Sequence, residues 1–295
     1  MILDVRHKTS YRYAANASFS QHLLRLTPLA GATQKVLDAR IEIDPKPEHV
    51  EPHADLFGNL QHVATVSRPH GELEIVATSR IERQGTDGLI FDASVPWEAT
   101  RNAALGIGGA SVVAALGPYA FPSQMTLADR AIEAYVQESF TPGRPILAAA
   151  AALSSRIHAD FAYQPGTTSA ETLPTEAFRQ RKGVCQDFAH VMLAGLRALR
   201  VPARYISGYL RTIPPKGKER LQGADASHAW VAVWDPAFGW VEFDPTNDCV
   251  PGADHVSLAH GRDYGDVSPV SGFVIGAGQQ HLKVEVDVVP VAEKA

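Results

Sequence analysis

The chain has 295 residues, of which 45% are apolar and 20% charged, and its formal net charge is −5. This length allows two domains, or one large domain with an appendage, and the composition is that of an ordinary globular protein. The 27 basic and 32 acidic residues are spread without long runs of one sign. Because nucleic acids and anionic membranes require a concentrated basic face, we expect neither as a partner.

Targeting and cysteine patterns exclude further classes. The first residues carry charges at Asp4, Arg6 and Lys8 instead of a long apolar run, so no signal peptide is predicted. No stretch approaches the ~18 consecutive apolar residues of a membrane span. The two cysteines, Cys185 and Cys249, are too few for a disulfide scaffold and lack the spacing of a zinc site. We predict a reduced, cytoplasmic protein with neither metal nor cofactor; the sequence indicates no oligomeric state.

Residues 1–84 are predicted to be β-structure. The segments 39–43 and 72–77 alternate or run apolar, turn-forming residues lie between them, and no helical periodicity competes. Prolines between residues 45 and 52 interrupt one connection. We therefore expect an all-β N-terminal domain, either a small antiparallel sheet or a sandwich.

Three further regions follow. Residues 85–125 are predicted to be a linker with a short helix, and their glycine-rich stretch 106–110 is no phosphate loop, because no Gly-Lys-Ser/Thr follows it. Residues 126–255 are predicted to form a core of helices and strands. Residues 256–295 are expected to be a C-terminal β segment.

Helical periodicity in the core begins near Thr126 and returns over 145–158. It is strongest in a third helix, which starts near Val184 and is stopped by Pro202. The third helix matters most for chemistry, because it begins at a cysteine.

Cys185 is the candidate nucleophile. A thiol is a strong nucleophile only as thiolate, and a helix N-terminus favours that anion through its free N–H groups and dipole. Arg181 and Lys182 lie just before it and could add positive potential. The alternative is a buried structural cysteine, which is the commoner fate of a lone Cys.

The base must be a histidine that can reach the thiol. His190 is nearest in sequence, but at ~100° per residue it points about 140° away from Cys185 on the helix, so we predict a packed or capping role for it. His228 begins a predicted strand and is therefore held at a defined sheet position. His228 is the preferred base.

The third member of the site is selected by strand parity. Residues 235–239 have the composition of a hairpin turn. If the tryptophans that border this turn lie opposite each other, Asp244 becomes a diagonal neighbour of His228, at about 7–8 Å between backbones. Glu242 shares that face and is the alternative; its other interpretation is a solvent-exposed strand carboxylate.

Three segments in the order Cys, His, Asp resemble the motifs of bacterial transglutaminase-like proteins, and the first ~85 residues resemble the β-rich region that often precedes this core. The segments are Gly183-Val184-Cys185-Gln186-Asp187-Phe188-Ala189-His190, Asp225-Ala226-Ser227-His228-Ala229-Trp230-Val231 and Gly239-Trp240-Val241-Glu242-Phe243-Asp244-Pro245-Thr246-Asn247. The resemblance implies an α+β fold: a papain-like or transglutaminase-like core, with helices packed on an antiparallel sheet, preceded by an all-β domain.

The resemblance also implies a papain-like cysteine mechanism that passes through a thioester acyl-enzyme. Its oxyanion could be stabilised by the backbone N–H of Cys185 or by the side chain of Tyr163, for which a core aromatic is the alternative.

The expected function is a cysteine-dependent acyl-group enzyme that acts on peptide or glutamine amides, with hydrolysis favoured over crosslinking. The alternative is a non-catalytic peptide-binding module with a transglutaminase-like core. A peptide N-glycanase-like role would usually bring paired-cysteine zinc motifs, which the chain lacks. Nothing in the sequence points to coenzyme A, as arylamine acetyl transfer would require.

Overall fold

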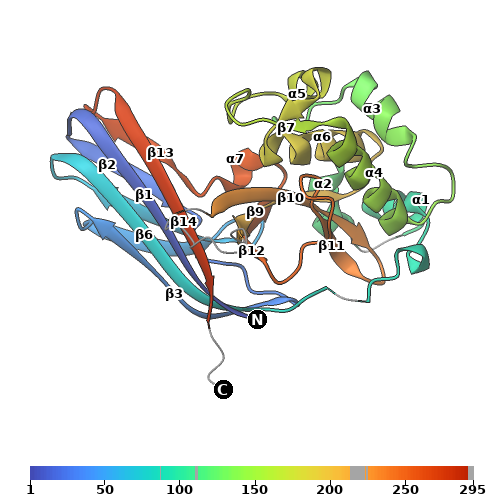
Figure 1. The fold of residues 1–295 in the computed structure, drawn as a ribbon, viewed down its shortest axis with the longest axis horizontal. Coiled ribbons are helices and arrows are strands. Elements are labelled where there is room, and N and C mark those ends of the chain that lie inside the picture. The colour runs from blue at the N-terminus through green and yellow to red at the C-terminus, as the bar shows by residue number, and fades with distance from the viewer. Residues whose placement is uncertain (87, 110–111, 213–222, 224, 292–295) are drawn as a thin grey trace, which may run out of the picture.

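A β-sandwich lies beside a sheet covered by helices (Figure 1). The computed structural model describes residues 1–86, 88–109, 112–212, 223 and 225–291. It confirms the predicted α+β class, with antiparallel sheets and a β-rich N-terminal region.

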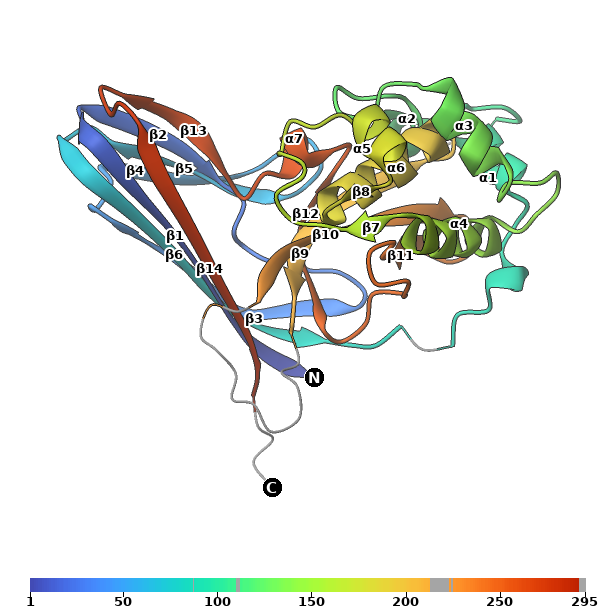
Figure 2. The same cartoon turned by 45° about the horizontal axis from the view of Figure 1, so that its top comes forward.

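The sandwich is built from both ends of the chain. Its two four-stranded antiparallel sheets have the strand orders β14-β1-β6-β3 and β13-β2-β5-β4. Their bounds are β1 (Ile2–Ala17), β2 (Phe19–Leu24), β3 (Gln34–Asp44), β4 (His49–Ala54), β5 (Leu60–Val66), β6 (His70–Arg83), β13 (Val270–Ile275) and β14 (Gln280–Pro290). The C-terminal strands therefore complete the sheets that the N-terminal strands begin, as Figure 2 shows for β14 beside β1.

The core sheet has the strand order β11-β10-β9-β12 and is covered by helices. Its strands are β9 (Ala203–Leu210), β10 (Ala226–Asp235), β11 (Gly239–Phe243) and β12 (His255–Gly261), and a short parallel pair is formed by β7 (Ala162–Tyr163) and β8 (Lys182–Gly183). The helical elements are η1 (Phe91–Ala93), α1 (Trp97–Ala104), α2 (Val113–Ala120), α3 (Arg130–Gln137), α4 (Ile146–Asp160), α5 (Pro174–Gln180), α6 (Cys185–Ala198) and α7 (Tyr264–Val267). The stretch 85–125, expected to be a linker with one short helix, thus carries η1, α1 and α2.

Helix α6 is the centre of the core. Every residue from Asp187 to Arg197 is buried, as expected for a helix enclosed on all sides. Gly195 lets α3 approach closely, because a Cβ atom at this position would lie 2.1 Å from Cγ2 of Val136. This packing fixes the direction of α6 and therefore the place of its first residue, Cys185.

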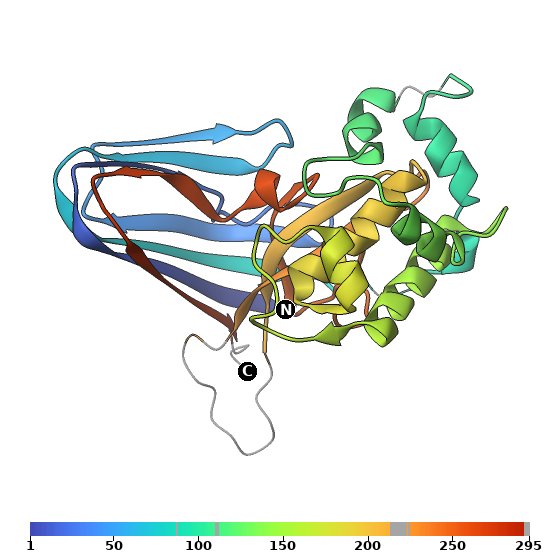
Figure 3. The same ribbon diagram turned by 90° about the horizontal axis from the view of Figure 1, so that it is seen from above.

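The sandwich is joined to the core along β12, the edge strand of the core sheet. The side-chain amide of Gln34 donates to the carbonyl of Ser257 (2.8 Å) and accepts the N–H of the same residue (2.9 Å). Asn59 makes the same pair of bonds with His260 (2.8 and 2.9 Å). Two amide side chains thus occupy backbone groups that a further strand would use. Figure 3 shows the sandwich beside the core sheet and its helices.

Candidate active site

Cys185 is the first residue of α6, as the sequence predicted. The carboxylate of Asp187, in the first turn of the helix, accepts the backbone N–H of Val184 (2.8 Å) and the hydroxyl of Thr168 (2.7 Å). Gly183 leaves room for this carboxylate, since a Cβ atom there would lie 2.4 Å from Asp187 Oδ2. The Asp187 carboxylate therefore fixes the two residues before Cys185, and Cys185 lies at the positive end of a 14-residue helix.

His228 and Asp244 are brought together by the β10–β11 hairpin. Trp234 lies opposite Trp240, as the parity argument assumed. Nε2 of His228 lies 2.7 Å from Oδ2 of Asp244, the residue that follows the end of β11. Of the two carboxylates considered from the sequence, Asp244 is the one that contacts the histidine.

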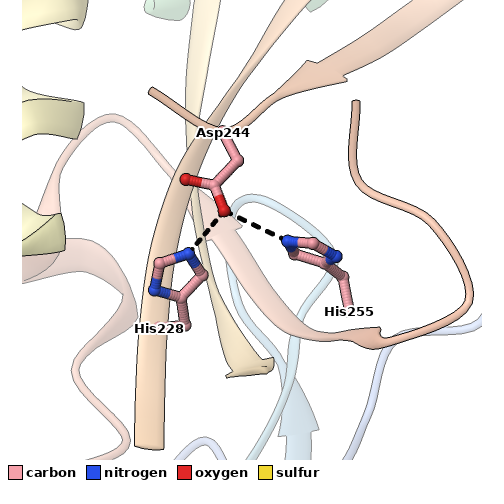
Figure 4. Close-up of side chains that lie close together, drawn as sticks. All are labelled: His228, Asp244 and His255. Carbon is pink, nitrogen blue, oxygen red and sulfur yellow. Dashed lines mark hydrogen bonds and ion pairs between the residues drawn. The ribbon is translucent and has the colours of Figure 1, made fainter. Parts of the chain in front are cut away.

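Asp244 is fully buried and receives five hydrogen bonds. Oδ1 accepts the backbone N–H groups of Thr246 (2.9 Å) and Asn247 (3.2 Å). Oδ2 accepts His228, the side-chain amide of Asn247 (2.6 Å) and Nε2 of His255 (3.1 Å), and Figure 4 shows the two imidazoles on either side of the carboxylate. Burial alone would raise the pKa of Asp244, but the bonds from the histidines outweigh it and hold this pKa far below its usual range.

The environment favours the charged form of His228. Burial by itself would lower its pKa, but hydrogen bonds to Asp244 and to Cys185, with the charges of both partners, raise the pKa to about 10. Because Asp244 occupies Nε2, the nitrogen available to Cys185 is Nδ1. The imidazole thus lies between a thiol at a helix N-terminus and a buried carboxylate, an arrangement that can hold and transfer one proton.

Comparison with known proteins agrees with this geometry. The model of the bacterial transglutaminase-like N-terminal region matches residues 3–82, and that of the transglutaminase-like superfamily matches residues 133–245. A protein of Mycobacterium tuberculosis whose function is uncharacterised is 37% identical over 294 residues, which are 97% of this chain and 92% of that protein. The chain belongs to the bacterial transglutaminase-like family.

Two further relatives of this transglutaminase-like chain are more distant. A protein-glutamine gamma-glutamyltransferase of Pseudomonas aeruginosa is 35% identical over 133 residues, which are 44% of this chain and 19% of that protein. A crystal structure from Cytophaga hutchinsonii, provisionally assigned as a cysteine protease, superposes with a TM-score of 0.74 at 22% identity and covers 100% of this chain and 92% of that one. This last likeness shows that the two proteins share a fold.

The other residues considered from the sequence have different surroundings. Tyr163 is 56% exposed, so it is not the core aromatic that was the alternative; its ring packs edge-on against Phe188, and burial together with the charge of Cys185 raises its pKa. Its role as an oxyanion donor stays a prediction. His190 is fully buried and accepts the backbone N–H of Tyr264 (3.2 Å), in agreement with its predicted packing role. Glu242 accepts the indole N–H of Trp230 (3.1 Å) and pairs with Arg83.

Sequence reasoning missed two neighbours of Asp244. His255 starts β12, and its Nδ1 lies 3.4 Å from the N–H of Gly252, which leaves Nε2 to donate to Asp244. Asn247 lies in the turn after Asp244 and was quoted only as part of a motif. The Asn247 contact is local and could have been suspected, because Asx side chains commonly bond within turns. The His255 contact depends on the return of the chain through β12, for which the sequence gives no local signal.

The two histidines and Asp244 could also be considered as a metal site, since their ligand atoms lie within 4.8 Å of one another. However, both Nε2 atoms point at the same oxygen at hydrogen-bond distances of 2.7 and 3.1 Å. An ion at this place would have to displace the protons that make these bonds. Hydrogen bonding accounts for this cluster, and metal independence stays a prediction to be tested.

A cavity of about 230 Å³ opens beside Cys185 and His228. One wall comes from the core; the other comes from the sandwich, through β1 and β14. A larger hollow of about 700 Å³ lies on the outer face of the sandwich, around Arg6 and Arg80, and contains none of the three predicted site residues. In the part of the chain that the structure describes, no helix is long and apolar enough to cross a membrane.

Proposed function

We propose that this transglutaminase-like protein is a cysteine-dependent acyl-group enzyme that cleaves peptide or glutamine amides. The observation that carries the proposal is the hydrogen bond of 2.7 Å between His228 and the buried Asp244, beside a cavity that His228 lines together with Cys185. Cys185 is the nucleophile, His228 the acid and base, and Asp244 the residue that orients His228.

In the first step, the thiolate sulfur of Cys185 attacks the amide carbonyl carbon. The C–N bond breaks as the imidazolium of His228 gives its proton to the leaving ammonia or amine, and a thioester remains. In the second step, the oxygen of a water molecule attacks the thioester carbonyl while His228 takes a proton from this water. The C–S bond breaks, the carboxylic acid product leaves, and the thiolate–imidazolium pair is restored.

Asp244 serves the cycle by fixing one tautomer. Its Oδ2 holds the proton on Nε2, so Nδ1 faces the thiol throughout. The charge of the buried carboxylate also stabilises the imidazolium that gives the proton in the first step. Because five hydrogen bonds satisfy this carboxylate, it needs no proton of its own.

Water is the acceptor that we propose, in preference to a protein amine. Crosslinking needs a surface that holds a second protein next to the thioester, whereas water at ~55 M needs none. The test follows acid or ammonia release and amine incorporation on the same glutamine peptide. Efficient incorporation of a primary amine at low millimolar concentration, with little hydrolysis, would show that the enzyme is a transferase. We also propose a reducing compartment such as the cytoplasm, since both cysteines are free.

Cys249 provides the control for the nucleophile. Partial burial of its thiol and the nearby charges of Asp244 and Asp248 raise its pKa to about 11, so at pH 7 it should react slowly although the residue is exposed. We expect iodoacetamide to label Cys185 far faster than Cys249. Cys185→Ala should abolish turnover of glutamine peptides, and Cys249→Ala should preserve it, with unchanged circular dichroism in both.

The same experiment separates the enzyme from a peptide-binding module. A binding module has no need of an activated thiol, so equal labelling rates of the two cysteines, or full turnover by Cys185→Ala, would refute the proposed function.

A further inference from the structure

Along β1 and β14, charged side chains lie on one face and uncharged side chains on the other. The two strands pair antiparallel, with His7 opposite Val286, Thr9 opposite Val284 and Tyr11 opposite Leu282. These six residues share one face, because side chains on a strand point alternately to its two sides. The opposite face carries the charged side chains, among them the pairs Arg6 with Asp287 and Lys8 with Glu285 in the same register. We call the six-residue uncharged face the inner strip.

The inner strip is covered by the core at one end only. His7 and Val286 are buried, and Nδ1 of His7 is hydrogen-bonded to the hydroxyl of Tyr209 on β9 (2.9 Å). Further along, Val284 is 45% exposed and Leu282 is 50% exposed. The open part of the strip lines the cavity that contains Cys185 and His228. Two aliphatic side chains are thus left uncovered beside the nucleophile.

Within the part of the chain that the structure describes, no Asp, Glu, Lys or Arg side chain lines this cavity. Its polar groups are hydroxyls, amides and imidazoles, such as Thr9, Ser207 and Gln186. Burial lowers the pKa of His7 to about 4, so this imidazole is neutral at physiological pH. Apart from the catalytic pair itself, these described lining residues offer no partner for a charged group, and a charge buried without a partner is strongly disfavoured.

The size of the cavity limits its occupant. At about 230 Å³ it is smaller than the ~300–1,000 Å³ typical of sites that enclose a whole drug-sized ligand. It therefore suits one or two residues of a longer chain, with the rest of the substrate outside.

We propose that the inner strip is the acyl-donor subsite, and that it selects peptides with uncharged side chains next to the reactive amide. This inference rests on the proposed function and deepens it. The peptide lies with an aliphatic or amide side chain against Val284 and Leu282, and its carbonyl carbon reaches Cys185. The sandwich is then a substrate-binding part of the enzyme, because it supplies one wall of the site.

Val284 and Val289 make a matched pair for the test. Both are valines on β14, with exposures of 45% and 44%, but Val284 lies on the inner strip and Val289 on the opposite face. The variants are Val284→Lys, Val284→Glu, Val289→Lys and Val289→Glu. Since both positions are half exposed, we expect all four to fold, which circular dichroism and urea midpoints will check.

The first readout uses no natural substrate. Cys185 is labelled with neutral iodoacetamide or with anionic iodoacetate. Mass spectrometry measures both rates, and the quantity compared is the iodoacetate rate divided by the iodoacetamide rate. A charge that lines the same cavity as the reagent should change this ratio by roughly three- to thirtyfold, upward for Val284→Lys and downward for Val284→Glu. The Val289 variants should stay within about twofold of wild type, because screening at physiological salt weakens effects beyond ~8 Å.

The second readout uses glutamine peptides with Leu, Glu or Lys next to the glutamine. Wild type should prefer Leu, and Val284→Lys should shift kcat/KM toward the Glu peptide by a similar factor. If Cys185 is reactive but the Val284 and Val289 variants respond alike, the subsite is wrong and the proposed function stands. If Cys185 reacts no faster than Cys249 in any variant, the proposed function fails and the subsite fails with it.

Discussion

Replacing Asp244 by Asn tests the proposed catalytic line most directly, because it changes one buried atom of known environment. Oδ2 accepts three side-chain donors, from His228, His255 and Asn247. In the variant, an NH₂ group at this position would meet these donors. His228 can relieve its clash only by moving its proton to Nδ1, where it faces Cys185 and can no longer accept the thiol proton.

The magnitude follows from this loss. Breaking a buried charged pair costs about 3–5 kcal/mol. If that energy is lost from the transition state, the rate falls by roughly 10²- to 10⁴-fold, since each 1.36 kcal/mol is tenfold. The assays are the labelling rate of Cys185 by iodoacetamide at pH 7 and acid or ammonia release from a glutamine peptide.

Glu242→Gln is the matched control for this variant. Glu242 lies on the same hairpin, but its carboxylate contacts Trp230 and Arg83 instead of His228. We expect this control to keep activity within about threefold of wild type, as for a group that makes no contact with the reacting atoms. Activity of Asp244→Asn within threefold of wild type, or an equal loss in Glu242→Gln, would refute the reasoning.

Four further outcomes are expected. His255→Phe should lower the free energy of unfolding by about 1.5–3 kcal/mol in urea titrations, the usual worth of a hydrogen bond to a charged group, and an unchanged midpoint would contradict this. The pKa of His228 is raised to about 10, so the stability that the protonated imidazole gives to the fold is fully present below pH 6.5 and is lost as pH rises through 10. kcat/KM should fall in the same alkaline range, and a fall centred near pH 6.5 would be contrary evidence. Gly195→Ala should destabilise by about 1–3 kcal/mol through its clash with Val136, whereas Gly117→Ala, where a Cβ meets nothing within 4 Å, should not. Turnover should survive a chelator, and loss that one added metal restores would show that a metal is needed.

Local patterns predicted the parts of the candidate site that depend on neighbouring residues. The start of α6 at Cys185 follows from helical spacing, and the end of this helix near Leu199 follows from the proline at 202. The contact between His228 and Asp244 follows from strand parity across the turn 236–238, and the observed register is the one assumed. The regular repeats of side-chain direction along a helix and along a strand determine short-range geometry of this kind.

Contacts between distant segments could not be predicted in the same way. The bond from His255 to Asp244 needs β12 to join the same sheet by pairing with β9, and the pairing of β14 with β1 joins segments far apart in the sequence. Tyr163 shows a different difficulty: an aromatic residue in an apolar context was compatible with the core or with the site, and only packing shows that it is largely exposed. Such outcomes are decided by tertiary structure, which residue pattern alone does not specify.

The pairing of β1 with β14 also sets the order of events during synthesis. Residue 9 leaves the ribosome long before its partner at 284 is made. At about 5–20 residues per second, the first strand waits on the order of 15–60 s for this neighbour. The nascent chain can therefore carry the thiol of Cys185 before the wall opposite that thiol exists, and the complete cavity forms only after residue 284 has been made.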